Sequence, residues 1–458
     1  MIAPLTQALP YPKKGSWGFP ILYGLIALTC LAHLLHDASS TLLGVSLPAL
    51  KARWHFSESM IGAIMAVFSA SASMLQPLWG WLADTAWLDA QTLSRHGTGQ
   101  YTLSGWLAGG LTLIALLLTA GFLPWIGAIT PNTQGGFTLL LSSIALGALG
   151  VGIFHPVGTS LMHSLSPSHL RHGLMNTFLC SGTLGGALGA WVYPTLGLQG
   201  LPQWLWVCLL ILPLYLWYAW HIIPYAQRNT SGASADTITS NPLPLNPQAA
   251  ASSVLTFSKT QKLWLLVALW SNNLCRTTMI LVIATFLPSV WRESHHLSDT
   301  TIAHAMMMNG LLATITGITL GRCLDQHPHH ETPLLTLCFC MTLFCAIPLC
   351  HSQGIGHIGL YWLLGGVLSA SVGVNVVMGL RTLQGHSNVV SGVIGGWAFG
   401  LSGLLMYPVG WWMEHEGVMP VMQTLLIGSS VLGLLSLGWF PWLLKRYQHT
   451  PSNPPVRN

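Results

Sequence analysis

Two charged side chains, Asp37 and Arg276, lie in the middle of long apolar runs. A charge at the centre of a bilayer costs about 2.5 to 3.5 kcal/mol on insertion scales, so it persists only where it faces a cavity or a partner. A carboxylate in that position can take up and release a proton, and a guanidinium can bind an anion. We predict that Asp37 carries a proton and that Arg276 is its counter-charge or binds an anionic solute. A fixed structural ion pair between the two is the alternative.

Three histidines lie beside Asp37 or in another apolar run. His33 precedes Asp37 by one helical turn and shares its helix face, His36 is adjacent, and His155 stands directly before Pro156. An imidazole with an ordinary pKa of about 6.5 can relay a proton, and His155 could also contact a substrate. Helix packing by a hydrogen-bonded histidine is the alternative for all three.

Four amides at membrane depth are candidate solute ligands, namely Gln76, Asn272, Asn273 and Asn375. Amide side chains in membrane helices also form hydrogen bonds between helices. Both interpretations stay open at this level.

Soft ligands on two further runs suggest a different cargo. Cys275 precedes Met279, and His304 precedes Met308, each by one helical turn. Thioether, thiol and imidazole groups suit Cu(I), so a copper or other soft-metal transporter is the alternative function. Methionines that fill gaps in a helix bundle would give the same pattern.

Enzyme motifs are weak or missing in the sequence. The string Gly400-Leu-Ser-Gly403 resembles the serine motif of intramembrane proteases, but such a serine needs a histidine base, and none is evident. Neither a phosphate-binding loop, a His-Glu-x-x-His zinc motif nor a dinucleotide fingerprint occurs. We therefore expect no enzyme activity, no cofactor and no use of ATP.

The elements that must position these residues are membrane spans. The sequence is 52% hydrophobic and 6% charged, whereas soluble domains have roughly 25% charged residues. Apolar runs of about 20 residues, long enough to cross a bilayer as a helix, recur throughout the chain. We predict twelve spans, near 19–47, 59–83, 103–124, 137–162, 173–197, 202–223, 262–290, 299–321, 333–350, 357–380, 389–413 and 420–443.

A segment rich in Ser, Pro, Asn and Thr, 224–261, divides these spans six and six. It predicts a cytoplasmic linker between an N-terminal lobe, 19–223, and a C-terminal lobe, 262–444. Residues 1–18 and 445–458 are then cytoplasmic tails. This topology places twelve of the 16 Lys and Arg on the cytoplasmic side and three outside, as the positive-inside rule requires. We expect a bacterial inner-membrane protein that binds no nucleic acid, because its basic residues do not cluster on one face.

The two halves repeat in the same direction. Gly80 and Asp84 end the second span in a Gly-x-x-x-Asp motif, and Gly321 and Asp325 end the eighth span in the same way. Each half also begins with a charged span that ends in Leu-Pro. Two such halves, related by an axis along the membrane normal, predict a solute cavity at their interface.

Glycines recur at small-xxx-small spacing in the fifth and eleventh spans, which permits close helix approach. The fifth span has Gly182, Gly186 and Gly189. The eleventh span has Gly392, Gly396, Gly400 and Gly403.

The Gly-x-x-x-Asp motifs resemble the loop motif of the major facilitator superfamily. Several other motifs are similar to its fosmidomycin-resistance exporters: His36-Asp37, Gln76-Pro77-Leu-x-Gly80, Phe154-His155-Pro156, Arg171-His172-Gly173, and Arg276 with Phe286-Leu287-Pro288. The resemblance implies an all-α fold of two six-helix lobes. It also implies that Gly80, Asp84, Gly321, Arg322 and Asp325 latch the cytoplasmic side.

We therefore expect a secondary transporter that exports a small, anionic or drug-like solute by alternating access between its lobes. A buried carboxylate favours protons as the driving ion. The expected partners are the solute, protons and the lipid bilayer. The sequence sets no oligomeric state and is compatible with a monomer.

Overall fold

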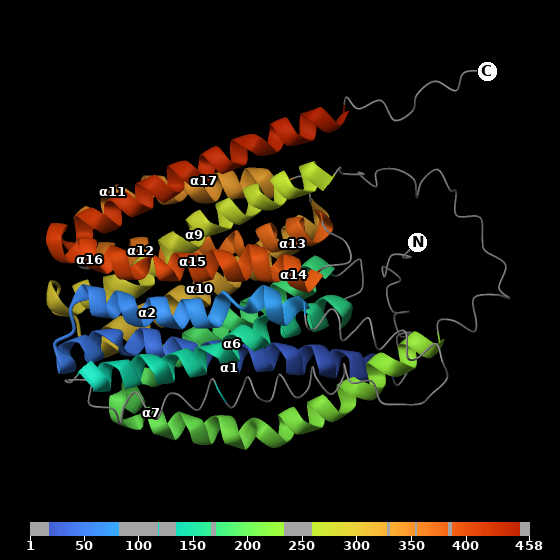
Figure 1. Ribbon diagram of the computed structural model, residues 1–458, viewed down its shortest axis with the longest axis horizontal. Helices are drawn as coiled ribbons and strands as arrows, with labels where there is room; N and C mark the ends of the chain where they lie inside the picture. The colour runs from blue at the N-terminus through green and yellow to red at the C-terminus, as the bar shows by residue number, and fades with distance from the viewer. Residues whose placement is uncertain are drawn as a thin grey trace.

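The computed structural model describes residues 18–81, 118, 134–165, 171–232, 259–327, 330–352, 355–382 and 387–448. Within these ranges the regular structure is helical (Figure 1). The first half has the helices α1 (Gly18–Trp54), α2 (Glu58–Ser73), α6 (Gln134–Leu165) and α7 (Arg171–Gly232). The second half has α9 (Lys259–Glu293), α10 (Asp299–Gln326), α11 (Glu331–His351), α12 (Ile355–Ala370), α13 (Val372–Thr382), α14 (Ser387–Ser391), η3 (Gly392–Trp397), α15 (Ala398–Leu404), α16 (Met406–Glu416) and α17 (Val418–Gln448).

The predicted spans match these helices wherever the structure describes them. Nine helices in the described ranges are long and apolar enough to cross a membrane. The predicted span 103–124 falls outside the described residues except for residue 118. The fifth and sixth spans both lie in α7, which reverses direction at Gly197 (φ 56°, ψ −174°), a backbone conformation that favours glycine.

The lobe and linker boundaries stay predictions. Helix α7 continues to Gly232, through the first residues of the predicted linker. Residues 233–258 of the linker lie outside the described part, as do 1–17 and 449–458 of the tails.

Matching turns follow α1 and α9 and show the internal repeat. His55 and His296 both have positive φ (54° and 53°). Ser57 and Ser298 then cap the next helices, where their hydroxyls accept hydrogen bonds from the backbone N–H of Met60 and Thr301. Because the two turns have the same conformation and order, the halves repeat in parallel, as the sequence indicated.

The two halves meet along helices rather than at one edge. Helix α2 packs against α15 and α16, and α7 packs against α10 (Figure 1). The Thr183 hydroxyl on α7 hydrogen-bonds the Thr314 hydroxyl on α10 at 2.9 Å. The Trp397 indole on η3 donates to the Met74 carbonyl at 3.1 Å.

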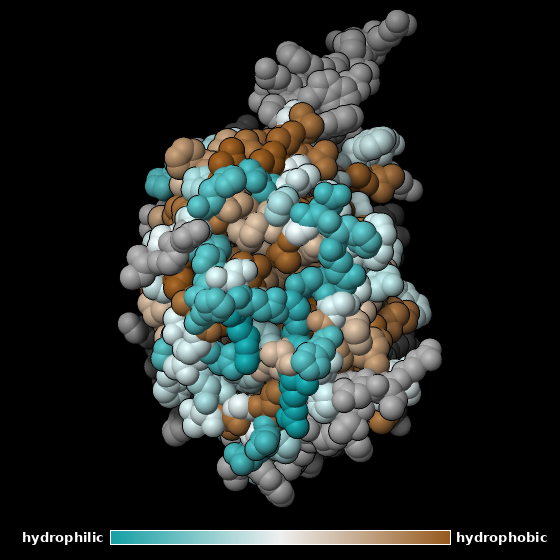
Figure 2. Space-filling model, turned by 90° about the vertical axis from the view of Figure 1, so that its left-hand side faces the viewer, coloured by the Kyte–Doolittle hydropathy of each residue, from teal (hydrophilic) through white to brown (hydrophobic). Residues whose placement is uncertain are grey.

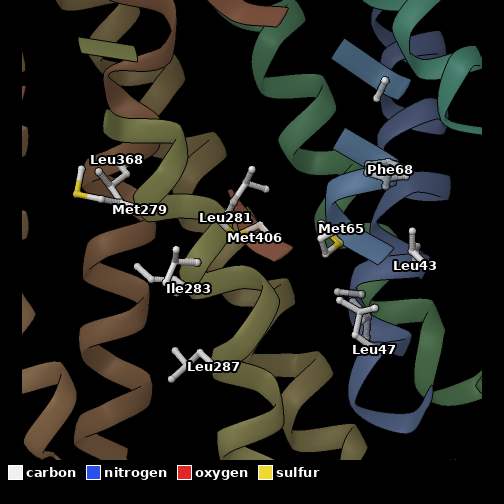
Figure 3. Close-up of a cluster of buried hydrophobic side chains, with 14 of the residues drawn as sticks. Leu43, Leu47, Met65, Phe68, Met279, Leu281, Ile283, Leu287, Leu368 and Met406 are labelled. Atoms are coloured by element: carbon white, nitrogen blue, oxygen red, sulfur yellow. The ribbon is translucent and has the colours of Figure 1, made fainter. Parts of the chain in front are cut away.

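A buried apolar layer surrounds the contact between the halves. Figure 3 shows Met65 and Phe68 on α2 across from Leu281 on α9 and Met406 on α16. Met406 is fully buried, and a Cβ at Gly62 would meet its backbone carbonyl. The absence of a side chain at Gly62 therefore lets the two halves approach at backbone distance.

One end of the bundle, which we call the distal end, is where α1 and α9 stop at Trp54 and Glu293. Figure 2 shows hydrophilic residues gathered over this end, with apolar residues toward its margins. Polar ends and apolar flanks are what a bundle that crosses a bilayer requires.

Candidate functional site

Three of the four predicted proton residues come together between α1 and α6. The His33 imidazole Nε2 lies 3.4 Å from Asp37 Oδ2, and the His155 imidazole Nε2 lies 3.5 Å from Asp37 Oδ1. His33 and Asp37 share a face of α1, and His155 comes from α6. We call these three residues the carboxylate–histidine cluster.

The cluster is closed on one side and open on the other. The His33 side chain is 3% exposed, whereas Asp37 and His155 are each 27% exposed. His33 stacks on Phe178 with ring centroids 4.3 Å apart, and His36 stacks on Phe154 at 4.1 Å. The carboxylate is therefore accessible in part, while aromatic rings contact the buried imidazole.

A backbone contact fixes the orientation of His33. Its Nδ1 lies 2.7 Å from the Phe178 carbonyl oxygen, which can only accept, so Nδ1 carries the proton. In a neutral His33, Nε2 then presents a lone pair to the Asp37 carboxylate. That arrangement is repulsive unless a proton sits on one of the two groups or a cation lies between them. His33 and Asp37 are therefore arranged to hold a proton or another cation between them.

Glycines in α7 permit this contact. A Cβ at Gly182 would collide with Asp37 Oδ2 and His33 Nε2, and Cβ atoms at Gly185 and Gly189 would collide with the carbonyls of Leu34 and Ala38. The predicted packing role of Gly182 and Gly189 is thus confirmed, and Gly185 joins them. Their spacing brings α7 to backbone distance from α1.

Arg276 lies in the other half, on α9. It is 6% exposed, and its Nε donates to Asn273 Oδ1 at 2.8 Å. Asn273 in turn donates to the Ile394 carbonyl at 2.6 Å, which ties the pair to η3. Within the described residues, no acidic side chain lies at ion-pair distance from Arg276. Asn273 is therefore an orienting partner of the guanidinium.

Asp37 and Arg276 do not form an ion pair in this conformation; Asp37 instead faces the two histidines of its own half. The repeat register explains the offset, because aligning Gly80 with Gly321 places Thr278 opposite Asp37. Thr278 hydrogen-bonds the Ser402 hydroxyl at 2.9 Å. An Asp37–Arg276 pairing in another conformation stays a prediction.

The other candidate amides lie in helix contacts. Gln76 donates to the Ala72 carbonyl and packs against Gly396 of η3. Asn375 donates to Asn272, which donates to the Gly433 carbonyl of α17. The bonds of Asn375 and Asn272 join helices, which is the alternative role noted above, whereas the Gln76 bond stays within its own span. A solute contact for these amides stays a prediction.

The predicted latch is described in part. Gly80 is buried, Arg322 is exposed, and a Cβ at Gly321 would collide with the Asn176 side chain of α7. Asp84 lies outside the described residues, and Asp325 lies in the last turn of α10, where its side chain is not described. Gly321 thus packs between the halves, and the latch interactions of the two aspartates stay predictions.

The soft-metal candidates differ in their exposure. Met279 is fully buried and its sulfur accepts from Ser430 at 3.4 Å, while His304 and Met308 are exposed. Cys275 is half-buried. In the described residues, the group of His, Cys, Asp and Glu close enough to hold a metal includes neither Cys275 nor His304.

The serine string is explained by packing. The Ser402 hydroxyl lies 2.8 Å from Thr277 and 2.9 Å from Thr278, and it donates to the Leu274 carbonyl. These partners belong to α9, so Ser402 joins α15 to α9.

A polar link between the halves at the distal end was not predicted from the sequence. Lys51 contacts Glu58 at 2.6 Å and Glu293 at 2.7 Å, which joins α1 to α9. Glu414 accepts from the Ser59 backbone N–H at 2.7 Å, which joins α16 to the start of α2. The only sequence signal was a lysine and three glutamates at the ends of spans.

The sequence pattern that defines the Major Facilitator Superfamily matches residues 29–383. The chain belongs to this superfamily. The predicted fold of twelve helices in two lobes is confirmed, and membership of the superfamily implies a membrane transporter.

Individual relatives cover nearly the whole chain. It is 24% identical over 427 residues to the fosmidomycin resistance protein of Escherichia coli (strain K12), covering 91% of this chain and 92% of that protein. It is 23% identical over 458 residues to the 4-hydroxybenzoate transporter PcaK of Pseudomonas aeruginosa, covering 91% and 94%. The resemblance to the fosmidomycin-resistance group is thereby confirmed.

Solved structures share the fold. A single-residue variant of the E. coli fucose:proton symporter FucP superposes with a TM-score of 0.52 at 15% identity, covering 90% of this chain and 98% of that one. FucP in the outward conformation gives 0.53 at 14% identity with the same coverage.

Proposed function

We propose that this superfamily member is a proton-coupled transporter that exports a small anionic or drug-like solute by alternating access. The observation that carries the proposal is the distribution of charge between the halves. The first half holds the carboxylate–histidine cluster, and the second holds Arg276 with no acidic partner among the described residues.

An anionic solute follows from the chemistry of Arg276. A buried guanidinium is stable only with a counter-charge, and its planar fork binds carboxylate or phosphate groups in a bidentate manner. One relative is named for 4-hydroxybenzoate, which is a carboxylate. The name of the other, a resistance protein, supports export.

Proton coupling follows from the facing lone pairs at His33 and Asp37. One proton between them removes the repulsion, and its loss restores it. The titratable groups around this pair are His155 and His36. A change in the charge of the cluster alters the field across the interface, which favours one orientation of the halves over the other.

The same proposal places the protein in a bacterial inner membrane with both termini in the cytoplasm. The distribution of Lys and Arg and the bacterial origin of the relatives support this. The distal end, with Lys51 and Glu293, is then extracytoplasmic. The protein needs no cofactor, and a monomer contains both halves of the site.

The test is solute flux in liposomes that contain the purified full chain under an imposed pH gradient. The solutes are 4-hydroxybenzoate and fosmidomycin, the two that its relatives are named for. We expect the gradient to drive wild-type flux, and Asp37→Asn to lose at least about tenfold of the gradient response. Arg276→Gln should raise KM by roughly 10- to 100-fold, because it removes a hydrogen bond from a charged group, which contributes about 1.5 to 3 kcal/mol.

His351→Gln is the matched control, because it changes an exposed histidine at the end of α11. It should transport like wild type. Flux that ignores the pH gradient would contradict proton coupling. Transport of copper alone, lost on changing Cys275 or Met279, would replace the proposal with the soft-metal alternative. In cells, export predicts less retained solute with wild type than with Asp37→Asn.

A further inference from the structure

The carboxylate–histidine cluster has the donor set of a metal site. Each of His33, Asp37 and His155 offers one ligand atom, and these atoms lie within 4.8 Å of one another. Within the part of the chain that the structure describes, no other set of three or more His, Cys, Asp or Glu gathers so closely. Two imidazoles and one carboxylate are a common set for zinc with an open position.

The distances fit a central ion better than direct contact. The two N–O separations are 3.4 and 3.5 Å, longer than the ~2.7 to 2.9 Å of a charge-assisted hydrogen bond. Two atoms bonded to zinc at about 2.0 to 2.1 Å in a tetrahedron lie about 3.3 to 3.4 Å apart. The two separations involve different carboxylate oxygens, Oδ2 toward His33 and Oδ1 toward His155, so either oxygen can bind an ion between the imidazoles.

The surroundings of His33 match those of a metal ligand. A ligating histidine typically donates its other ring N–H to a backbone carbonyl, which directs the lone pair at the metal. His33 does this through Nδ1 and the Phe178 carbonyl at 2.7 Å. Gly182 supplies room, because a Cβ there would fill the space beside Asp37 Oδ2 and His33 Nε2.

We propose that His33, Asp37 and His155 bind one divalent first-row transition metal ion, of the class of Zn²⁺ or Co²⁺. Imidazole nitrogen and carboxylate oxygen favour these ions over Cu(I), which prefers sulfur. Three protein ligands leave one position for water on the exposed side of Asp37 and His155. The site lies in the first half, so it is distinct from the candidates on α9 and α10.

The inference goes beyond proton-coupled transport and does not depend on it. An ion held by these three atoms occupies the space between His33 and Asp37. It therefore excludes a proton from that space, and Zn²⁺ should inhibit gradient-driven flux.

The experiment is Co²⁺ titration of the tag-free, detergent-solubilised full chain, read by visible d–d absorption and by calorimetry with Zn²⁺. The loop histidines His327, His329 and His330 are first replaced by alanine, so that they contribute no binding. We expect one equivalent of Co²⁺ with an intense tetrahedral spectrum. Asp37→Asn, His33→Gln and His155→Gln should each weaken binding by at least about tenfold.

His351→Gln, tested in the same background, should leave both spectrum and affinity unchanged. Thermal unfolding without metal identifies variants that have lost their fold. If His33→Gln unfolds, His155→Gln still tests the proposal, because the His155 side chain is 27% exposed. Absence of a stoichiometric Co²⁺ spectrum, or one unchanged in all three variants, would overturn the proposal. Neither solute nor gradient is present, so this result is separate from that of the flux assay.

Discussion

Gly182 is the residue on which the carboxylate–histidine cluster depends most directly without taking part in its chemistry. It faces Asp37 and His33 from α7, and an added methyl group would overlap both side chains. The cluster therefore needs glycine here for space rather than for backbone conformation.

We predict that Gly182→Ala lowers gradient-driven flux at least about tenfold while the chain still inserts. The methyl group must displace Asp37 or His33, and overpacking of this kind typically costs about 1 to 3 kcal/mol. Flux in liposomes and the yield of folded protein give the two readouts. Gly44→Ala on α1 is the control, since nothing lies within 4 Å of its Cβ. Equal flux in the two variants would contradict the spatial role of Gly182.

The pairing of His33 with Asp37 could be predicted because one helical turn separates them. The approach of His155 and of the Phe178 carbonyl could not, because it depends on how α6 and α7 pack on α1. The expected opposition of Asp37 and Arg276 was read from similar spacing in the two halves. In the structure, the residue of the second half that corresponds to Asp37 is Thr278. The alignment inferred from spacing, which paired Asp37 with Arg276, was therefore wrong by two residues.

At the scale of elements, the second span, Glu58–Trp81, contacts the eleventh span of the other half through glycines. A Cβ at Gly396 would collide with Gln76, and one at Gly392 with the Pro77 backbone. Both glycines belong to η3, a π-helical turn, which is a feature found frequently at functional sites. The small residues on this face keep two helices from different halves in backbone contact.

Gly396→Ala should lower the midpoint of thermal unfolding in detergent, with a loss of about 1 to 3 kcal/mol from overpacking against Gln76. Gly395→Ala is the matched control on the neighbouring residue, because nothing lies within 4 Å of its Cβ. It should keep or raise the midpoint, since alanine favours a helix over glycine. The same loss in both variants would mean that the helix, and not the interface, responds.

Apolar run length predicted the spans that the structure describes, because each must cover the same bilayer thickness. The break between the predicted spans 173–197 and 202–223 coincides with the reversal at Gly197. Run length could not predict the π-helical turn at 392–397, because it depends on a local backbone conformation that average hydrophobicity does not record. The small-xxx-small spacing predicted close approach, but the partner helices follow only from the fold.

At the scale of the whole molecule, Lys51 links the halves at the distal end through Glu293, and its other partner, Glu58, belongs to its own half. The second half contains an equivalent pair, Arg292 with Asp299 at 2.8 Å, that stays within one half. The two pairs have the same spacing of seven residues. Of these two pairs in the described residues, Lys51–Glu58 contacts a third partner in the other half, so its loss should affect the orientation of the halves more than loss of Arg292–Asp299.

Glu293→Gln should shift the protein toward a conformation open at the distal end. Glu293 is 52% exposed, so the pair contributes about 0.2 to 1 kcal/mol, equivalent to roughly a 1.4- to 5-fold change in the ratio of conformations. Spin labels on cysteines introduced at Ala52 and His296, in a chain whose native cysteines are replaced by serine, report the distribution of distances between these two positions by double electron–electron resonance.

Asp299→Asn removes the pair within one half and should leave that distribution unchanged. High salt should reduce the difference between wild type and Glu293→Gln, because an exposed pair is screened. Identical distributions in all three proteins would contradict a role of the Lys51–Glu293 pair in the orientation of the halves.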